Sequence, residues 1–222
     1  ERVDGSSLFP FIEAGSSDLY VVPRFSTAFH DPFAEIPTLT MLCSFFNKDG
    51  EPLASAPRYT LLKALNAFEE VTGMQFEAMG ELEYYVIAPD EGLFPATDQK
   101  GYHESAPYAK FNEFRQECMA FIAQAGGQIK YGHSEVGNFT IDGKIYEQNE
   151  IEFLPVAAAN AADQLVIAKW IIRNLAYRYG FDITFAPKIT AGKAGSGLHI
   201  HMRITKDGKN MMLENGVLST VA

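Results

Sequence analysis

The feature that most constrains the fold of this chain is the mixture of helical and hairpin-like connections between its strand-like segments. Four segments have the apolar pattern of strands, at 75–88, 128–136, 149–156 and 197–204, and three have apolar residues at helical spacing, at 57–73, 108–125 and 160–180. The Asp-Gly pair of "TKDGK" follows the last of these strands and favours a hairpin. We therefore predict an α+β fold with a largely antiparallel sheet flanked by helices.

The predicted helices have recognisable ends. Pro57 suits the first turn of the first helix, and Gly73 ends that helix, because glycine readily adopts the left-handed conformation of a helix C-terminus. Asn160 is predicted to cap the third helix through its side chain, and Gly180 is predicted to end it. Residues 1–56 instead predict short strands separated by turns.

The composition narrows the class of partner. The chain has 222 residues, of which 47% are hydrophobic, and its formal net charge is −10. A surface with this charge is poorly suited to neutralising phosphates, so we predict no nucleic-acid partner. No apolar run approaches the length of a membrane span and no signal peptide is recognisable, so we also predict no membrane association.

Two carboxylates in "GELEYYV" are predicted to share one face of a strand. Glu81 and Glu83 are two residues apart, and successive side chains of a strand point to opposite faces. Neighbouring carboxylates repel one another unless something positive lies between them, and a divalent cation with oxygen ligands would fill that role. A solvated sheet face rich in glutamate is the alternative interpretation.

Further carboxylates follow on the next predicted strands. Glu135 lies in "GHSEVG", and Glu150 and Glu152 share a face in "EQNEIEF". Each of these by itself fits an ordinary surface charge. Together with Glu81 and Glu83 they place carboxylates on successive strands of one sheet, which solvation explains less well than a shared cation does.

The segment "GSGLHIHM" adds two histidines to this set. His199 and His201 share a strand face by the same parity, while Leu198, Ile200 and Met202 are predicted to face the core. The glycines just before them would let backbone N–H groups approach a ligand closely. A surface strand that happens to carry two imidazoles is the alternative interpretation.

The predicted ligands favour one kind of metal. Carboxylates with an imidazole suit Mg²⁺ or Mn²⁺, whereas a structural zinc site would need more thiolates and imidazoles. Two such ions close together usually handle phosphoryl groups, because they bridge phosphate oxygens and neutralise developing charge. The chain has neither a Walker phosphate loop nor a G-x-G-x-x-G turn.

Taken in order along the chain, the motifs resemble those of the glutamine synthetase family. The similar blocks are "VDGSS", "SSDLYVVP", "GELEYYV", "HSEV", "EQNEIEF", "TFAPK", "GSGLHIHM" and "KDGKN". The resemblance implies the remainder of a β-grasp-like N-terminal domain at 1–56 and the N-terminal portion of a glutamine synthetase-like catalytic domain at 57–222. It also implies a cytoplasmic protein whose full-length form is a ring-shaped homo-oligomer.

The resemblance further implies an ATP-dependent ligase. Members of the family phosphorylate the γ-carboxylate of glutamate with ATP, and ammonia then displaces phosphate from γ-glutamyl phosphate to give glutamine. By matching position, Glu83, Glu135 and Glu150 resemble the ligands of one Mg²⁺ or Mn²⁺ ion, and Glu81 and His199 resemble those of a second.

Four other residues take their implied roles from the same resemblance. His201 and Arg203 correspond to positions on the ATP side of the site, and Gly195 corresponds to part of the glutamate-binding loop. Asp4 resembles the catalytic aspartate that reaches a neighbouring subunit's site and helps to deprotonate ammonium.

The chain departs from the family pattern at several positions. Ala194 stands where an asparagine is usual, Lys130 stands where a carboxylate is expected, and Arg203 replaces a serine. The stretch before Glu150 is longer than usual, and its "DGKIY" is predicted to form an inserted hairpin. These departures keep two alternatives open, namely a γ-glutamyl ligase acting on another amine and a non-catalytic relative that retains the fold.

The ends of the sequence predict a fragment. The chain opens on "ERVDGSS" without an initiator methionine. In the family, the arginines that clamp the phosphates and the last glutamate ligand of the second metal lie beyond the part that this chain resembles. We therefore expect the isolated chain to make no γ-glutamyl product.

Overall fold

A computed structural model of the chain describes all residues 1–222. It contains two compact units, one formed by Glu77–Arg203 and the other by Glu1–Phe76 together with Ile204–Ala222. The predicted division into 1–56 and 57–222 follows family domains rather than contacts, and it stays a prediction.

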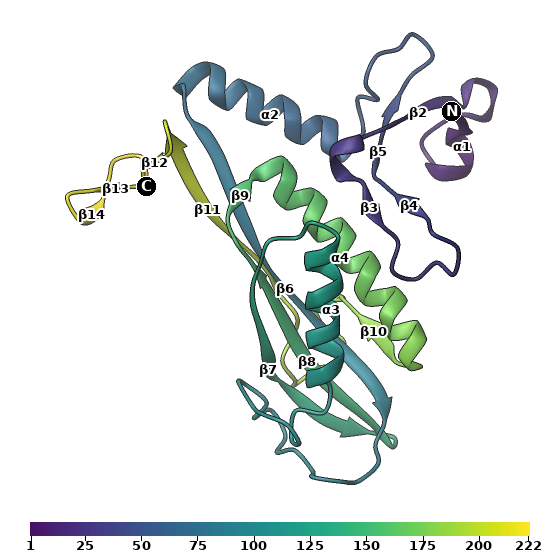
Figure 1. Ribbon diagram of the computed structural model, residues 1–222, viewed down its shortest axis with the longest axis vertical. Coiled ribbons are helices and arrows are strands. Elements are labelled where there is room, and N and C mark those ends of the chain that lie inside the picture. Colours follow the sequence, from purple (N-terminus) through teal and green to yellow (C-terminus); the bar gives the residue numbers. More distant parts are fainter. The chain divides into compact units, whose positions relative to one another are not determined.

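The unit Glu77–Arg203 is built around an antiparallel sheet (Figure 1). Its strands are β6 (Gln75–Pro89), β7 (Ile129–Ile141), β8 (Lys144–Phe153), β9 (Val156–Ala157), β10 (Asp182–Thr184) and most of β11 (Leu198–Lys206). β6 lies between β8 and β11, and β7 follows β8 on the outer side. Because β6 pairs antiparallel with β8 and β8 pairs antiparallel with β7, the predicted kind of sheet is confirmed.

Two helices cover one face of this sheet (Figure 1). α3 (Asn112–Gln124) packs on β7 and β8, and α4 (Ala158–Tyr179) packs on α3, β9 and β10. The side chains between the layers are apolar and fully buried, Phe114 and Ile171 among them. The fold thus matches the predicted α+β class.

The helix predicted at 108–125 begins later than expected. α3 starts at Asn112, because the backbone N–H groups of Lys110 and Phe111 donate to the buried Glu147 carboxylate of β8, at 2.7 and 3.2 Å. These hydrogen bonds hold the residues just before α3 against the sheet, so the helix does not include them.

The predicted capping of α4 is half right. Gly180 ends the helix with a φ of 72°, as expected for a left-handed C-terminal residue. Asn160, however, lies inside the helix, and Ala157 at the N-cap makes no side-chain hydrogen bond to the first turn. β9 leads directly into α4 and pairs with β6, so strand pairing rather than a side-chain cap sets where the helix begins.

Three two-residue turns close hairpins in this chain. In each, a polar residue and the glycine after it both have positive φ, as type I′ turns require: Asp142-Gly143, Asp207-Gly208 and Asn215-Gly216. They join β7 to β8, β11 to β12 (Lys209–Asn210), and β13 (Leu213–Glu214) to β14 (Val217–Leu218). The hairpins predicted at "DGKIY" and "TKDGK" are confirmed.

The second unit contains short strands, as predicted for 1–56. β2 (Asp18–Pro23) lies between β1 (Arg2–Asp4) and β5 (Cys43–Phe46), and β3 (Phe29–His30) pairs with β4 (Leu39–Thr40). Its helices are α1 (Gly5–Leu8), α2 (Pro57–Thr72) and two single 3₁₀ turns at Ala14–Ser16 and Phe25–Thr27. α2 ends at Gly73 as predicted. The chain contains no helix with the length and apolar character needed to cross a membrane.

One predicted core face is wrong. Leu198, Ile200 and Met202 of β11 are 42%, 48% and 58% exposed rather than buried. Alternation determines which side chains of β11 share a face, but it does not determine whether another layer covers that face.

Candidate metal centre

Cross-strand register brings the predicted carboxylates together. Glu83 of β6 lies opposite Glu150 of β8, which in turn lies opposite His133 of β7. One step along the sheet, Glu81 lies opposite Glu152. Because directly opposite side chains of an antiparallel pair begin about 5 Å apart, the register alone brings these four carboxylates within reach of one another.

The cluster lies on the sheet face away from the helices. Asn149 of β8 accepts a hydrogen bond from Arg115 of α3, so its neighbour Glu150 points to the other side. Glu83, Glu150 and Glu152 are nevertheless buried, each less than a tenth exposed. These carboxylates therefore gather in a sheltered position rather than on an open, solvated face.

β11 brings its two histidines to the same face. His199 Nδ1 lies 3.0 Å from Glu81 Oε2 and 3.9 Å from Glu83 Oε1, and His201 Nε2 lies 2.7 Å from Glu81 Oε1. A Cβ atom added to Gly197 would lie 2.9 Å from both Glu83 Oε1 and His199 Nε2, so glycine leaves the room that these groups occupy. The shared face predicted for the two histidines is confirmed, while their ligand roles stay predictions.

His133 is a member of the cluster that the sequence interpretation missed. Its Nε2 lies 3.4 Å from Glu150 Oε2 and 3.8 Å from Glu152 Oε1. Each of these three residues offers one atom that could bind a metal ion, and these atoms lie within 4.8 Å of one another. Its Nδ1 lies 3.7 Å from Glu135 Oε1. The two-residue spacing between His133 and Glu135 on a predicted strand was the signal that could have identified it.

Glu135 lies where β7 departs from regular pairing. The register of β7 and β8 shifts between Ser134 and Asn138, and Glu135 Oε2 accepts a hydrogen bond from the backbone N–H of Val136 at 2.9 Å. Bulges of this kind change the direction of a side chain and are frequent beside functional sites. Glu135 thus lies beside the irregularity and, two residues after His133, still approaches the cluster.

The cluster is electrostatically unfavourable without a cation. Burial, and then repulsion from Glu83, Glu135 and the other glutamates, raises the pKa of Glu150 to about 8. Burial together with Glu135 likewise raises the pKa of Glu83. Buried carboxylates that resist ionisation in this way fit a divalent cation, which would supply the missing positive charge.

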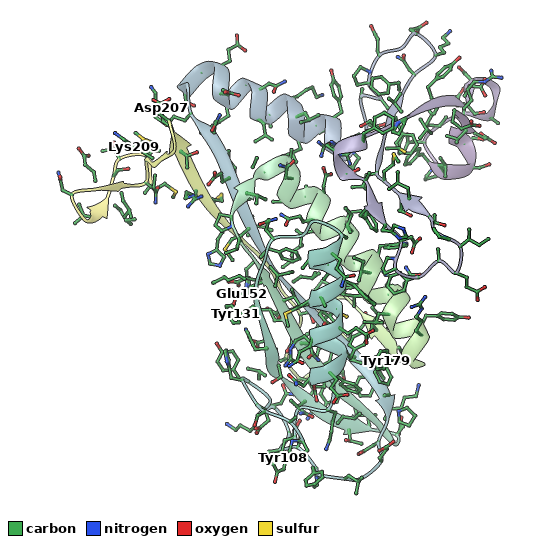
Figure 2. The ribbon with its side chains drawn as sticks, in the orientation of Figure 1. Tyr108, Tyr131, Glu152, Tyr179, Asp207 and Lys209 are labelled. Atoms are coloured by element: carbon green, nitrogen blue, oxygen red, sulfur yellow. The ribbon has the colours of Figure 1, made fainter.

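Glu152 differs from its neighbours because it has a cationic partner. Lys130 Nζ lies 2.7 Å from Glu152 Oε2, and Tyr131, which Figure 2 labels beside Glu152, also donates to it. Burial raises the pKa of Glu152, but the hydrogen bonds from Lys130 and Tyr131 outweigh it and leave the pKa below its usual range. Lys130, the departure from the family pattern, thus neutralises one carboxylate of the cluster.

A glutamine links the cluster to the predicted glutamate-binding loop. Gln148 Nε2 donates to Glu83 Oε2 at 2.7 Å and to the carbonyl oxygen of Gly195 at 2.8 Å. A Cβ atom added to Gly195 would lie 2.3 Å from the carbonyl oxygen of Pro187, so only glycine allows this close approach. The loop position is therefore coupled to the orientation of a predicted metal ligand.

Ala194 is held by its backbone alone. Its N–H donates to Gln99 Oε1 at 2.6 Å, and its carbonyl accepts from Tyr85 Oη at 2.8 Å. The loop consequently keeps a defined conformation without the asparagine side chain that the family usually has there.

The remaining predicted site residues have partners of their own. Arg203 forms an ion pair with Glu77 of β6. Asp4, in the other compact unit, caps α1 and accepts hydrogen bonds from the side chains of Ser6 and Ser7 at 2.7 and 2.9 Å. These hydrogen bonds hold the pKa of Asp4 far below its usual range. The roles predicted for Asp4 and Arg203 stay predictions.

Comparison with known families decides what kind of protein this is. Residues 54–222 match the glutamine synthetase catalytic domain, and residues 1–48 match the glutamine synthetase beta-Grasp domain. The chain belongs to the glutamine synthetase family.

Relatives within the glutamine synthetase family are moderately similar in sequence. The glutamine synthetase of Thermus thermophilus is 30% identical over 221 residues, which cover 93% of this chain and 46% of the relative. A 3-hydroxylaminophenol mutase of Cupriavidus pinatubonensis is 29% identical over 245 residues, which cover 96% of this chain and 50% of the relative. The chain thus spans about half the length of these curated relatives.

Solved structures support the fold. The glutamine synthetase of Plasmodium falciparum has a TM-score of 0.83 at 21% identity, covering 97% of this chain and 46% of that chain. A ligand-free structure of GmaS has the same TM-score and identity, covering 99% of this chain and 51% of that chain. The expected glutamine synthetase-like architecture is confirmed.

The raised pKa of Glu150 predicts how pH affects stability without metal. An acid whose pKa is higher in the folded state favours folding when protonated, and this contribution is lost as pH rises from the ordinary value of 4.5 to about 8. The midpoint of thermal unfolding of metal-free protein should therefore be lower at pH 8.5 than at pH 6. Glu150→Gln should flatten this dependence. An equally steep dependence in that variant would assign it to another group.

Proposed function

We propose that the whole protein is an ATP-dependent ligase that joins ammonia to the γ-carboxylate of glutamate and gives glutamine. The observation that supports this most strongly is the gathering of five predicted ligands on one sheet face: Glu81, Glu83, Glu135, Glu150 and His199. They come from four strands, β6, β7, β8 and β11, and family membership implies this reaction.

Two cation positions are proposed within this cluster. Glu83, Glu135 and Glu150 would hold one Mg²⁺ or Mn²⁺ ion, and Glu81 with His199 would hold another. Bound there, such ions would neutralise the charge of ATP phosphates during phosphoryl transfer. The chain's own contribution is to fix the ligands on paired strands and to orient Glu83 through the hydrogen bond from Gln148.

The substrates are proposed to lie along the same face. His201 and Arg203 follow His199 at two-residue spacing on β11 and would face the nucleotide. Gly195, whose close packing excludes a side chain, would present backbone to glutamate. Asp4, kept ionised by its hydrogen bonds, would act on ammonium in a neighbouring subunit. We infer a ring-shaped homo-oligomer in the cytoplasm from family membership.

The proposed reaction has two steps. An oxygen of the γ-carboxylate attacks the terminal phosphorus of ATP, and ADP leaves with the bonding electrons. The nitrogen of ammonia then attacks the carbonyl carbon of the acyl phosphate, loses a proton, and phosphate leaves.

One alternative function is supported by particular observations, and a second is less well supported. Ala194, held only by its backbone, leaves the amino-acid side of the pocket different from the family pattern, which favours a γ-glutamyl ligase for a different amine. The similarity to a 3-hydroxylaminophenol mutase also supports an activity other than glutamine formation. A non-catalytic relative is less well supported, because it would retain repelling buried carboxylates without use for them.

An amine panel with the full-length protein tests these functions. We expect glutamate-dependent phosphate release from ATP to have its highest kcat/KM with ammonia, compared with methylamine, ethylamine and ethanolamine. A higher kcat/KM with one of the organic amines would replace ammonia as the substrate. Absence of phosphate release with every amine, although Mn²⁺ still raises thermal stability, would contradict a catalytic role.

A further inference from the structure

A cavity at the far end of the same strands is separate from the acidic cluster. Its volume is about 470 Å³, within the range of about 300–1,000 Å³ that small-molecule sites have. Ala88 of β6 and Ile145 of β8 line it and lie directly opposite each other, five residues along each strand from Glu83 and Glu150. The cavity is thus built on the rigid sheet and not on loops alone.

The body of the cavity is apolar and aromatic. Phe94, Phe111 and Phe181 line it, and the rings of Phe111 and Phe181 meet edge to face with centroids 5.1 Å apart. Leu93 and Phe94 also line it, yet they are 63% and 52% exposed. Large apolar side chains left exposed around a concave surface are typical of a ligand site.

The charge around the cavity is predominantly negative. Its lining contains three carboxylates, on Asp90, Glu91 and Glu113, and the single ammonium of Lys110. Lys110 Nζ donates to the carbonyl oxygens of Leu93 and Phe94, so this cation is already used to hold the chain.

Two of the three carboxylates remain available to a ligand. Asp90 accepts hydrogen bonds from the backbone N–H of Gly92 at 2.9 Å and from Thr140 Oγ1 at 3.1 Å. Glu91 and Glu113 are both exposed and both line the cavity, Glu91 shortly after β6 and Glu113 in the first turn of α3. A positive group bound at the rim would therefore meet these two carboxylates.

The wall formed by residues 90–111 is held in place before any ligand binds. The Glu147 carboxylate accepts the backbone N–H groups of Lys110 and Phe111. Tyr108, labelled in Figure 2, meets Phe94 edge to face with centroids 6.0 Å apart. Phe94 itself has a φ of 48°, which is unfavourable for a bulky residue and which the bonds from Lys110 maintain. A preformed wall lowers the ordering cost of binding.

We propose that this cavity binds a small hydrophobic ammonium compound. Its apolar or aromatic body would lie among the phenylalanines, and its ammonium group would lie at the rim between Glu91 and Glu113. A carboxylate or phosphate ligand would instead be repelled by these two side chains. The proposal concerns binding alone and does not depend on the ligase activity proposed above.

Calorimetric titration of the full-length protein at low ionic strength tests the proposal with four probes. Phenethylammonium carries both the ring and the charge, whereas 2-phenylethanol lacks the charge, 3-phenylpropionate reverses it, and methylammonium lacks the ring. We expect phenethylammonium to bind about tenfold more tightly than 2-phenylethanol, because two exposed carboxylates each contribute about threefold. The affinity for phenethylammonium should fall as salt is added. The other two probes should bind more weakly still.

Variants locate the binding. The double variant Glu91→Gln/Glu113→Gln should bind phenethylammonium about tenfold more weakly, and both residues are exposed, so folding should not suffer. Glu70→Gln, an exposed carboxylate of α2 outside the cavity lining, is the matched control and should bind as the wild type does. Glu150→Gln should also leave binding unchanged, which separates this cavity from an amine-acceptor site at the acidic cluster.

Several results would overturn the proposal. Equal affinity for 2-phenylethanol would show that the rim charge is not recognised. Full affinity in the double variant, or its loss in Glu150→Gln, would place the probe elsewhere. Absence of any heat or thermal shift with phenethylammonium at millimolar concentration would show that the cavity does not take this class of ligand.

Discussion

Replacing Glu150 with glutamine should make the metal-free protein more stable and should nearly abolish its stabilisation by Mn²⁺. Glutamine has almost the same shape but no charge, so it removes the repulsion that raises the pKa of Glu150 to about 8. The same change weakens a cation site that needs ionised oxygen ligands. The two effects have opposite signs, which a general loss of folding cannot reproduce.

The size of the Mn²⁺ effect follows from linkage. A cation present at about 100 times its Kd stabilises the folded state by about 2.7 kcal/mol, which for a chain of this length is roughly 5–10 °C in the unfolding midpoint. If Glu150→Gln weakens affinity about 100-fold, about 0.4 kcal/mol remains at the same concentration. In the whole protein, Glu150→Gln should lower the rate of glutamine formation at least about 100-fold, because the proposed reaction needs the cation.

Thermal unfolding with and without Mn²⁺ measures both effects. Glu70→Gln on α2 is the control for a simple loss of one negative charge, and both its metal-free midpoint and its Mn²⁺ shift should match the wild type. A Glu150→Gln protein that retains the full Mn²⁺ shift would contradict the proposed cation site. One that loses stability without metal would contradict the repulsion argument.

Replacing Glu147, three residues earlier on β8, should instead make the protein less stable and leave its stabilisation by Mn²⁺ intact. It is fully buried on the helix side of the sheet, where its carboxylate accepts the backbone N–H groups of Lys110 and Phe111. Glu147→Ala would leave both donors without their partner, at about 1–3 kcal/mol each. We therefore expect the free energy of unfolding to fall by about 2–6 kcal/mol, with or without Mn²⁺.

Denaturant unfolding measures this loss, and the retained Mn²⁺ response distinguishes it from damage to the cation site. Glu147→Gln is the conservative comparison. It keeps one oxygen acceptor but places an NH₂ group near the second donor, so its cost should lie between those of wild type and Glu147→Ala. A cost below about 1 kcal/mol for Glu147→Ala would show that water or a shifted backbone satisfies the two N–H groups.

The predictions that rest on periodicity and turn chemistry hold well in this chain. The helices at 57–73 and 160–180 end at the predicted glycines, and the Asp-Gly pairs form the predicted hairpins. These features depend on local backbone preferences, because only glycine and a few polar residues adopt positive φ readily. Strand parity likewise put His199 and His201 on one face.

The predictions that fail are those that depend on distant partners. Asn160 has the chemistry of a helix cap, but the pairing of β9 with β6 places the start of α4 before it. Ile200 and its apolar neighbours on β11 have the pattern of core residues, but they are largely exposed, because alternation does not determine which distant segments pack over a strand. His133 was missed because its partner Glu150 lies on another strand.

The sequence by itself determined the family resemblance, the antiparallel kind of sheet and which acidic and imidazole side chains share a strand face. These follow from residue order, alternation and turn chemistry, which are local properties. Only the tertiary structure decided which strands lie side by side, that His133 joins the carboxylates and that Lys130 neutralises Glu152. It also decided that Glu147 and Glu150, three residues apart, stand on opposite faces, where Glu147 accepts backbone N–H groups and Glu150 lies among other carboxylates. Register and packing between distant segments set the distances on which these interactions depend.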